Sequence, residues 1–391
     1  MNTTQRFRIF NVVGARPNMM KIAPIIAEMR RHSDLHPVLV HTGQHYDFAM
    51  SQVFLQQLDL GEPDYNLQVG SGTHHSQTAQ VIRTFGELVQ NDRPDMIVVA
   101  GDVNSTVACA LVGAKELIPV AHIESGLRSF DRQMPEEVNR VITDAIADLL
   151  FTTEQSAARN LMQEGVPSEK IFFTGNVMID SLVTALAAAR RSTILDQLGV
   201  RPQKYAVLTL HRPSNVDDPE RLQSTLRAIS EIAKDIPVIF PIHPRTAGRV
   251  SSLRIENIRD WSGTAAIGSQ GIWTVPPASY LDFLCLMDSS AMMITDSGGV
   301  QEETTYLGIP CLTYRDNTER PVTITNGTNR LIGTSPAELV IAAKKALSEK
   351  HRNGHVPPPL WDGHAAERIV RVIRNYWNSN DIGKKIDRKR H

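Results

Sequence analysis

The sequence lacks an excess of charge of either sign. Its 41 Lys and Arg residues balance 42 Asp and Glu residues, so the formal net charge of the 391-residue chain is -1. Without a surplus of positive charge, no overall field attracts nucleic acid or an anionic membrane, and a bound anion must be held by local groups. We therefore expect no nucleic-acid partner.

Long apolar runs and targeting signals are also missing. No run approaches the ~20 residues that a membrane-spanning helix needs. The N-terminus passes directly into the strand-like segment FRIFNVV, without the charged start, apolar centre and small-residue cleavage site of a signal peptide. These absences predict a cytoplasmic protein that does not insert into membranes.

Cysteine is scarce, and no metal-ligand pattern is present. The three cysteines lie far apart in apolar surroundings without a CxxC spacing: Cys109, Cys285 and Cys311. This predicts small core residues in a reducing compartment. Neither the pair His41 and His45 nor the pair His74 and His75 has a carboxylate or a cysteine at ligand spacing, so we expect no metal site.

Short apolar runs alternate with helical patterns along the chain. In the first half the expected strands are residues 8–13, 37–43, 96–101, 118–123, 148–153 and 170–175. In the second half they are residues 205–210, 237–242, 272–275, 291–295, 309–314 and 329–333. Strands that alternate with helices predict parallel sheets covered by helices.

The length of the chain and its alternation of strands and helices together predict an α/β protein of two doubly wound, Rossmann-like domains. We expect the N-terminal domain to span residues 1–177 and the C-terminal, nucleotide-binding domain residues 178–363. The last helix, residues 364–380, has an apolar face and is expected to return to the first domain. Ligands gather beyond the carboxyl ends of parallel strands and at domain junctions, so we expect the two sheets to face a cleft.

Carboxylates follow two expected strands of the first half. Asp102 and Glu124 each come one residue after an apolar strand. A helix cap for Asp102 and an ion pair with Arg128 for Glu124 are simple alternatives. Two carboxylates at the ends of neighbouring strands nevertheless favour one shared site.

Two segments near these carboxylates add further candidates. Pro135 precedes Glu136 and Glu137 at a predicted helix start, with Arg140 one turn later. The helix dipole and pairs with Arg140 explain both glutamates without a function, but they lie close to Glu124. In GARPNMMK, Arg16 and Lys21 flank another helix start, which suits a phosphate.

Anion-binding signals dominate the second half. His211 with Arg212 and His243 with Arg245 follow two of its strands, which favours anion contact. In TDSGGVQEE, the adjacent residues Gly298 and Gly299 let backbone N–H groups approach a ligand, and Ser297 adds a hydroxyl donor. Phosphate is the ligand that this helix start favours, while Glu302 and Glu303 suit ribose hydroxyls.

Together these segments resemble the non-hydrolysing UDP-N-acetylglucosamine 2-epimerases. The resemblance covers nearly the whole chain and rests on GARP with a following Lys, TGQH, GD, HIESGLR, MPEEVNR, GNVMID, HR, TDSGGVQEE and RDNTERP, in this order. It implies a GT-B-like fold with the active site between two Rossmann-like domains, and a homodimer. It also implies that neither a metal nor a nicotinamide cofactor takes part.

The resemblance implies inversion at C2 of UDP-N-acetylglucosamine to give UDP-N-acetylmannosamine. UDP is eliminated to leave a 2-acetamidoglucal and is then added back. Asp102, Glu124 and Glu136 would do the acid–base work, with His211 near the reacting sugar and diphosphate. The candidate substrate-binding residues are Arg16, Lys21, Gln44, His45, Arg140, Arg212, His243, Ser297, Gly298, Gly299 and Glu303.

The chain departs from the family pattern at several positions. Asn18 and Ser214 stand where many members have glutamate, which leaves the identity of the sugar open. Bacterial members commonly carry a second, regulatory UDP-N-acetylglucosamine site. Gln44 and His45 match part of that site, whereas residues 70–80 differ from the usual segment.

Other functions remain open from the sequence. The nearest alternative is a 2-epimerase of another UDP-2-acetamido sugar, such as a diacetamido uronic acid derivative. A hydrolysing epimerase, a GT-B glycosyltransferase and a two-lobed binding protein for a sugar nucleotide share parts of the pattern, and fold alone does not separate them. The acidic cluster around Glu124 has less reason to exist in a transferase or a binding protein.

Overall fold

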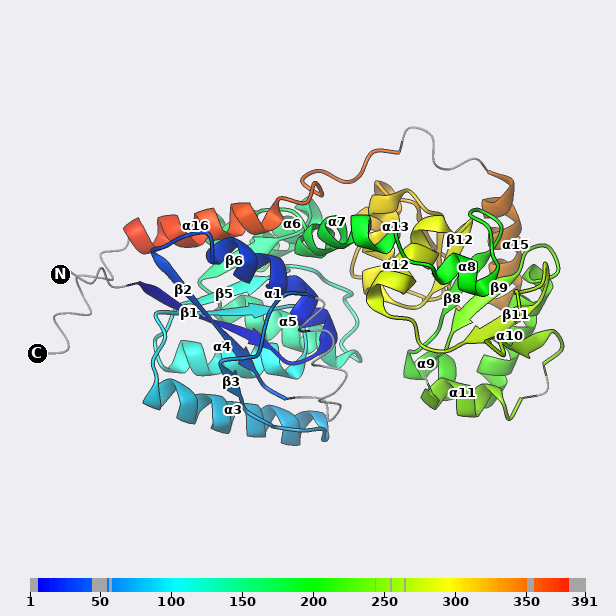
Figure 1. The fold of residues 1–391 in the computed structure, drawn as a ribbon. Helices are drawn as coiled ribbons and strands as arrows, with labels where there is room; N and C mark the ends of the chain where they lie inside the picture. Colours follow the sequence, from blue (N-terminus) through cyan, green and yellow to red (C-terminus); the bar gives the residue numbers. More distant parts are fainter. Residues whose placement is uncertain are drawn as a thin grey trace, which may run out of the picture. The chain divides into compact units, whose positions relative to one another are not determined.

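The computed structural model contains two compact units, each built around its own sheet (Figure 1). It describes residues 6–43, 55, 58–242, 244–253, 255–263, 265–349 and 355–379, without the side chains of Arg16, Pro244 and Arg245. Unit 1 comprises Met1–Ser181 and Pro359–His391, and unit 2 comprises Leu182–Pro358.

The sheet of unit 1 has seven strands in the order β3-β2-β1-β4-β5-β6-β7. Every pairing between them is parallel. The strands are β1 (Phe7–Val13), β2 (Leu35–His41), β3 (Tyr65–Asn66), β4 (Met96–Ala100), β5 (Val120–Ile123), β6 (Leu149–Thr152) and β7 (Ile171–Phe173). The central strands read as continuous apolar runs because helices bury both faces of the sheet.

Helices cover both faces of this sheet. They are α1 (Arg16–Met29), α3 (His74–Asn91), α4 (Asn104–Lys115), α5 (Pro135–Ile146), α6 (Gln155–Gln163), the short 3-10 helix η1 (Ser168–Lys170), the start of α7 (Val177–Ala189) and α16 (Ala365–Ser379). The apolar sides of α1 and α16 pack on one face, and those of α3 and α4 pack on the other. The last helix therefore belongs to the core of unit 1, as its apolar face predicts.

Unit 2 repeats the plan with a parallel sheet in the order β10-β11-β9-β8-β12-β13-β14. Its strands are β8 (Ala206–Thr209), β9 (Val238–Pro241), β10 (Ile258–Asp260), β11 (Ile272–Val275), β12 (Met292–Thr295), β13 (Cys311–Thr313) and β14 (Asn329–Leu331). Its helices are α8 (Ile194–Leu198), α9 (Pro213–Val216), α10 (Pro219–Ile232), α11 (Pro244–Val250), α12 (Tyr280–Ser289), α13 (Gly298–Leu307), α14 (Val322–Thr325) and α15 (Pro336–Ser348). The apolar sides of α10 and α15 build the larger core cluster of this unit.

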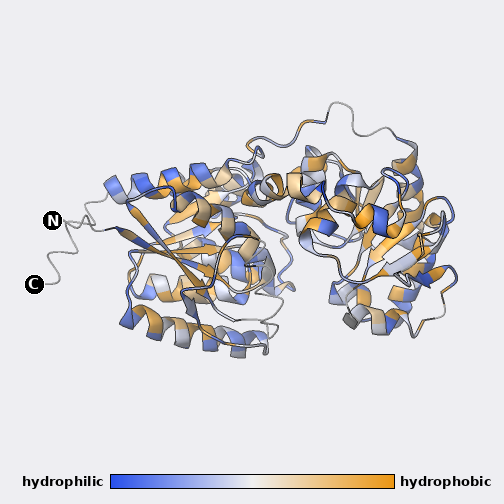
Figure 2. Ribbon diagram, in the orientation of Figure 1, coloured by the Kyte–Doolittle hydropathy of each residue, from blue (hydrophilic) through white to orange (hydrophobic). Residues whose placement is uncertain are grey.

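The predicted α/β fold class is confirmed. All twelve expected strands form, and hydrophobic residues concentrate in the strands and on the inner sides of the helices (Figure 2). The sequence reading missed β3 and β10, which are short edge strands with polar residues. The three cysteines are buried, as predicted. No described helix is both long and apolar enough to cross a membrane.

Near the middle of each sheet lies a point where the strand order reverses. In unit 1 the chain runs outward from β1 through β2 to β3 and then returns to place β4 on the other side of β1. In unit 2 the reversal lies between β8 and β12. Loops at the carboxyl ends of such strands diverge and leave room for a ligand.

Candidate active site

A buried ion pair joins helix α1 to the loop after β5. Lys21, in the second turn of α1, places Nζ 2.8 Å from Oε2 of Glu124, and the two side chains are 7% and 2% exposed. Gly101 follows β4 with a φ of 66°, and a Cβ at this position would lie 2.7 Å from the Lys21 ammonium. Glycine therefore provides both the left-handed turn and the space for the lysine.

Glu124 itself has an unusual backbone conformation. Its φ of 67° lies in the left-handed region, which is rare for a residue with a side chain. Such a conformation persists only where surrounding contacts enforce it, and it is found most often at functional sites. The left-handed backbone therefore fixes the direction of the Glu124 side chain and makes this residue a candidate for a functional role.

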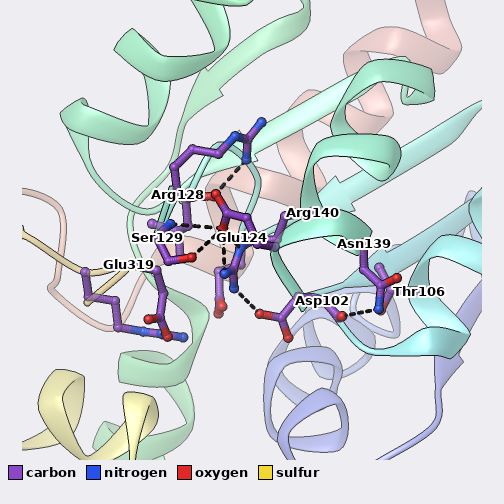
Figure 3. A network of polar contacts seen from close by, with 12 residues as sticks. Asp102, Thr106, Glu124, Arg128, Ser129, Asn139, Arg140 and Glu319 are labelled. Carbon is purple, nitrogen blue, oxygen red and sulfur yellow. Dashed lines mark hydrogen bonds and ion pairs between the residues drawn. The ribbon is translucent and has the colours of Figure 1, made fainter. Parts of the chain in front are cut away.

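Asp102 follows Gly101 and is held by helix α5. Arg140 Nη1 forms an ion pair with Asp102 Oδ2, and Asn139 Nδ2 donates to the Asp102 carbonyl oxygen at 2.8 Å (Figure 3). The Asp102 side chain is partly exposed, whereas Arg140 is buried. The residue that precedes α4 as its N-cap is Val103, so the simple capping role for Asp102 does not apply.

The two neighbouring glutamates at the start of α5 differ in their surroundings. Glu137 is buried, and it accepts from the backbone N–H groups of Ser129 and Phe130 at 2.9 Å each and from Arg140 Nη2 at 2.8 Å. Burial alone would raise the pKa of Glu137, but these hydrogen bonds and the charge of Arg140 lower it on balance. Glu136 is only half-buried. Glu137 thus braces the loop, whereas Glu136 keeps part of its surface exposed.

In unit 2 a buried carboxylate organises the loop after β8. Asp296 follows β12 and accepts from the backbone N–H groups of His211 and Arg212 at 3.1 and 2.9 Å, and from Asn215 Nδ2 at 3.1 Å. The His211 imidazole also meets it, with Nδ1 2.8 Å from Oδ1. Burial alone would raise the pKa of Asp296, but the hydrogen bond and charge of His211 and the N–H of Arg212 lower it on balance.

Helix α13 begins beside this carboxylate. Ser297 occupies its N-cap without a side-chain hydrogen bond to the first turn. Gly298 has no room for a side chain, since a Cβ there would lie 2.6 Å from Arg320 Nη1 and 3.0 Å from Glu319 Oε1. An uncapped helix start offers backbone N–H groups and about half a positive charge to an anion.

The two glutamates of α13 are buried, and each has a protein partner. Arg320 Nε lies 2.9 Å from Glu302 Oε1, and both side chains are buried. The Tyr280 hydroxyl donates to Glu303 Oε1 at 3.2 Å. Asn18, one of the departures from the family pattern, is likewise turned inward and donates to the Ala100 carbonyl at 2.5 Å.

The structure brings several predicted site residues together within each unit. In unit 1 they are the pairs of Lys21 with Glu124 and of Asp102 with Arg140. In unit 2, Asp296 joins the loop of His211 and Arg212 to the start of α13. Gln44, His45 and His243 lie outside the described residues, as does the Arg16 side chain.

Sequence reasoning missed two residues that shape these loops. Asp296 was visible between an apolar strand and two glycines, and its place directly after a strand was the available signal. The sequence does not distinguish Glu137 from Glu136, because both satisfy the same helix-start pattern. Within the described part of the chain, no cluster of three or more His, Cys, Asp or Glu side chains is arranged to hold a metal ion.

Comparisons with known proteins identify the family of this chain. The sequence profile of the family described as UDP-N-acetylglucosamine 2-epimerase matches residues 27–374. A UDP-N-acetylglucosamine 2-epimerase of Methanocaldococcus jannaschii is 39% identical over 375 residues, which cover 93% of this chain and 97% of that protein. A UDP-2,3-diacetamido-2,3-dideoxy-D-glucuronate 2-epimerase of Pseudomonas aeruginosa is 38% identical over 346 residues, which cover 88% and 93%.

The fold matches solved structures over almost its whole length. The crystal structure of Methanocaldococcus jannaschii UDP-GlcNAc 2-epimerase in complex with UDP-GlcNAc and UDP superposes with a TM-score of 0.82 at 38% identity. The match covers 94% of this chain and 99% of that one.

Proposed function

This chain belongs to the UDP-N-acetylglucosamine 2-epimerase family, and from that premise we propose that it interconverts UDP-N-acetylglucosamine and UDP-N-acetylmannosamine. The proposal rests on two groups of charged and polar residues, one in each unit, in the loops near the point where the strand order of the sheet reverses. Unit 1 holds the carboxylates Asp102 and Glu124, each fixed by a buried cation. Unit 2 presents an uncapped helix start beside the His211 loop.

The chemistry requires both kinds of group. The proton at C2 of the sugar is not next to a carbonyl, so its removal must be coupled to departure of UDP. Proton-transfer groups must reach both faces of C2, which calls for more than one carboxylate. The leaving diphosphate needs cations and backbone N–H donors, because its charge grows in the transition state.

Each unit supplies one half of this requirement. In unit 1, Asp102, Glu124 and Glu136 are the acid–base groups, and Arg140 and Lys21 hold the first two in place. In unit 2, the first turn of α13 binds the diphosphate. His211, whose side chain is 59% exposed, reaches the leaving group, and Glu303 accepts from the ribose.

Incubation with UDP-N-acetylglucosamine in heavy water tests the proposal. We expect deuterium at C2 and formation of the manno epimer of the intact UDP-sugar. Release of free N-acetylmannosamine would instead identify a hydrolysing epimerase, and unchanged substrate would contradict the proposed activity. Parallel incubation with UDP-2,3-diacetamido-2,3-dideoxy-D-glucuronate decides the sugar, since faster exchange with that compound would overturn the proposed substrate.

A homodimer in the cytoplasm completes the proposal. The family resemblance supports the dimer, and so do Val138 and Ile142, which lie one turn apart on α5 and are 40% and 41% exposed. The three buried free cysteines support the location, because they suit a reducing compartment. Light scattering of the purified protein measures the oligomeric state, and a monomer mass at working concentration would contradict the dimer.

A further inference from the structure

A fully buried histidine connects the loops that carry the two candidate carboxylates. His122 lies on β5, two residues before Glu124, and its side chain has no exposed surface. Its Nδ1 atom lies 2.7 Å from Asp144 Oδ1, and its Nε2 atom lies 2.9 Å from the carbonyl oxygen of Gly101. Both ring nitrogens therefore face oxygen atoms at hydrogen-bond distance.

These two partners determine the protonation of the ring. A backbone carbonyl only accepts, and an ionised carboxylate only accepts, so both nitrogens of His122 must donate. Asp144 is kept ionised by Arg128, whose Nη1 lies 2.7 Å from its Oδ2 atom. Burial alone would raise the pKa of Asp144, but the charges and hydrogen bonds of His122 and Arg128 lower it on balance.

Arg128 links Asp144 to a second carboxylate, Glu164, whose side chain is partly exposed. Arg128 pairs with Glu164, at the end of α6, at 2.6 Å, as well as with Asp144 on α5. Asp144 thus lies between the His122 ring and the Arg128 guanidinium, and Arg128 also meets a second carboxylate. A buried charge is tolerated only where it is paired and hydrogen-bonded, and this cluster satisfies that condition for an imidazolium.

The cluster touches both candidate catalytic loops. The Gly101 carbonyl that accepts from His122 belongs to the peptide leading directly into Asp102. Asp144 also accepts from the backbone N–H of Gly126 at 3.0 Å, in the turn that follows Glu124. One carboxylate–imidazolium pair is therefore bonded to the backbone beside Asp102 and to the backbone beside Glu124.

We propose that His122 is a positioning residue: as an imidazolium held by Asp144, it fixes the Gly101–Asp102 peptide relative to the turn that carries Glu124. The inference rests on the proposed function, because it takes Asp102 and Glu124 as the proton-transfer groups. His122 does not reach the substrate and acts through these two loops.

Nuclear magnetic resonance of the wild-type protein labelled with 15N-histidine tests the protonation directly. An unperturbed imidazole has a pKa of about 6.5 and is mostly neutral at about pH 8. We expect one ring with both nitrogens protonated at that pH, and we expect its signals to vanish in His122→Gln. Absence of a doubly protonated ring would overturn the proposal, and this measurement does not depend on activity.

Kinetics of His122→Gln test the positioning. A glutamine amide donates to one of the two oxygens but not to both. The variant therefore loses either the hydrogen bond to the Gly101 carbonyl or the one to Asp144. Because small misplacements of catalytic groups are costly, we expect kcat to fall about 100-fold while KM and UDP affinity stay within about 3-fold. Asn11→Ala is the control, since Asn11 is fully buried on β1 and its amide donates to the Ile9 carbonyl, two residues away, at 3.1 Å.

The outcomes separate the two proposals. A folded His122→Gln protein with wild-type kcat would overturn the positioning role. If the variant does not fold, the resonance experiment on the wild type still decides the protonation. If the wild type shows no C2 exchange on either UDP-sugar while the doubly protonated ring is present, the proposed function fails and the imidazolium assignment stands.

Discussion

The Nδ1 atom of His211 lies 2.8 Å from Oδ1 of Asp296, a carboxylate without exposed surface. The two residues are 85 positions apart and follow the adjacent parallel strands β8 and β12. An ionised carboxylate at Nδ1 keeps a proton on that nitrogen and sets the orientation of the ring. Asp296 thus prepares His211 for its contact with the substrate.

Asp296→Asn should therefore impair His211 without removing it. An amide nitrogen can face Nδ1 and reverse the tautomer, so we expect kcat to fall ~100-fold, the range of a lost acid–base partner. Asp288→Asn is the control, because Asp288 carries the same charge in unit 2 but pairs at 2.9 Å with Arg190. Equal activity of both variants would contradict the role of Asp296.

Glu136→Gln and Glu137→Gln should separate catalysis from stability. Glu136 is half-buried at the helix start, so its amide variant should lower turnover by at least ~100-fold and leave the thermal midpoint and UDP affinity nearly unchanged. Glu137 accepts from Ser129 and Arg140, so its variant should lower the thermal midpoint. Calorimetry and the C2 exchange assay on the same samples measure both effects. A stable, fully active Glu136→Gln protein would remove Glu136 from the mechanism.

Breaking the Lys21–Glu124 pair should cost stability as well as activity. Both side chains are buried, and removal of one partner from a buried pair costs ~3–5 kcal/mol in free energy of unfolding. We expect Lys21→Met to be more destabilising than the double variant Lys21→Met with Glu124→Gln, because the double variant leaves no buried charge at the pair. Additive effects in denaturant unfolding would show that the two residues are not coupled.

Each candidate acid–base group is expected to act in turnover rather than in binding. Asp102→Asn and Glu124→Gln should each lower the rate of C2 exchange at least ~100-fold while UDP affinity stays nearly intact. Titration calorimetry with UDP supplies the affinity. Wild-type exchange in these two variants and in Glu136→Gln would end the assignment of the epimerase mechanism to these carboxylates.

Asp180 should make the stability of unit 1 depend on pH. Its carboxylate accepts from the backbone N–H groups of Ala365 and Ala366 at 3.1 and 2.7 Å, at the start of α16. Burial raises its pKa from the ordinary 3.8 to about 6 in spite of these hydrogen bonds. A raised pKa in the folded state means that the folded state binds the proton more tightly. The stability that Asp180 contributes is therefore complete below 3.8 and is lost as the pH rises through about 6.

Two substitutions test this behaviour. Asp180→Asn keeps an acceptor for α16 without the titrating charge, so the difference in thermal midpoint between wild type and variant should move in favour of the variant from about pH 4 to about pH 7. Asp180→Ala loses the acceptor and should cost about 1 kcal/mol, as other helix N-caps do. A difference that does not change with pH would contradict the raised pKa.

Local patterns predicted most of the fold. The apolar runs at residues 96–101 and 291–295 became β4 and β12, because a strand buried on both faces must be apolar throughout. The edge strands β3 and β10 escaped prediction because they are short, and a short polar segment carries no period. Helix α5 ends at Ile146 because the chain enters strand β6 at Leu149.

The sequence by itself determined the alternation of strands and helices, the carboxylates that follow β4 and β5, and the open helix start after β12. These features depend on residue order and on local backbone chemistry, which a linear reading captures. Only the tertiary structure decided that Asp296 meets His211 and that Glu137 rather than Glu136 braces its loop. It also decided that Asp144 binds the turn after Glu124 directly and the loop before Asp102 through His122. Pairing of parallel strands brings together residues that lie far apart in the chain, and no local period encodes which strands become neighbours.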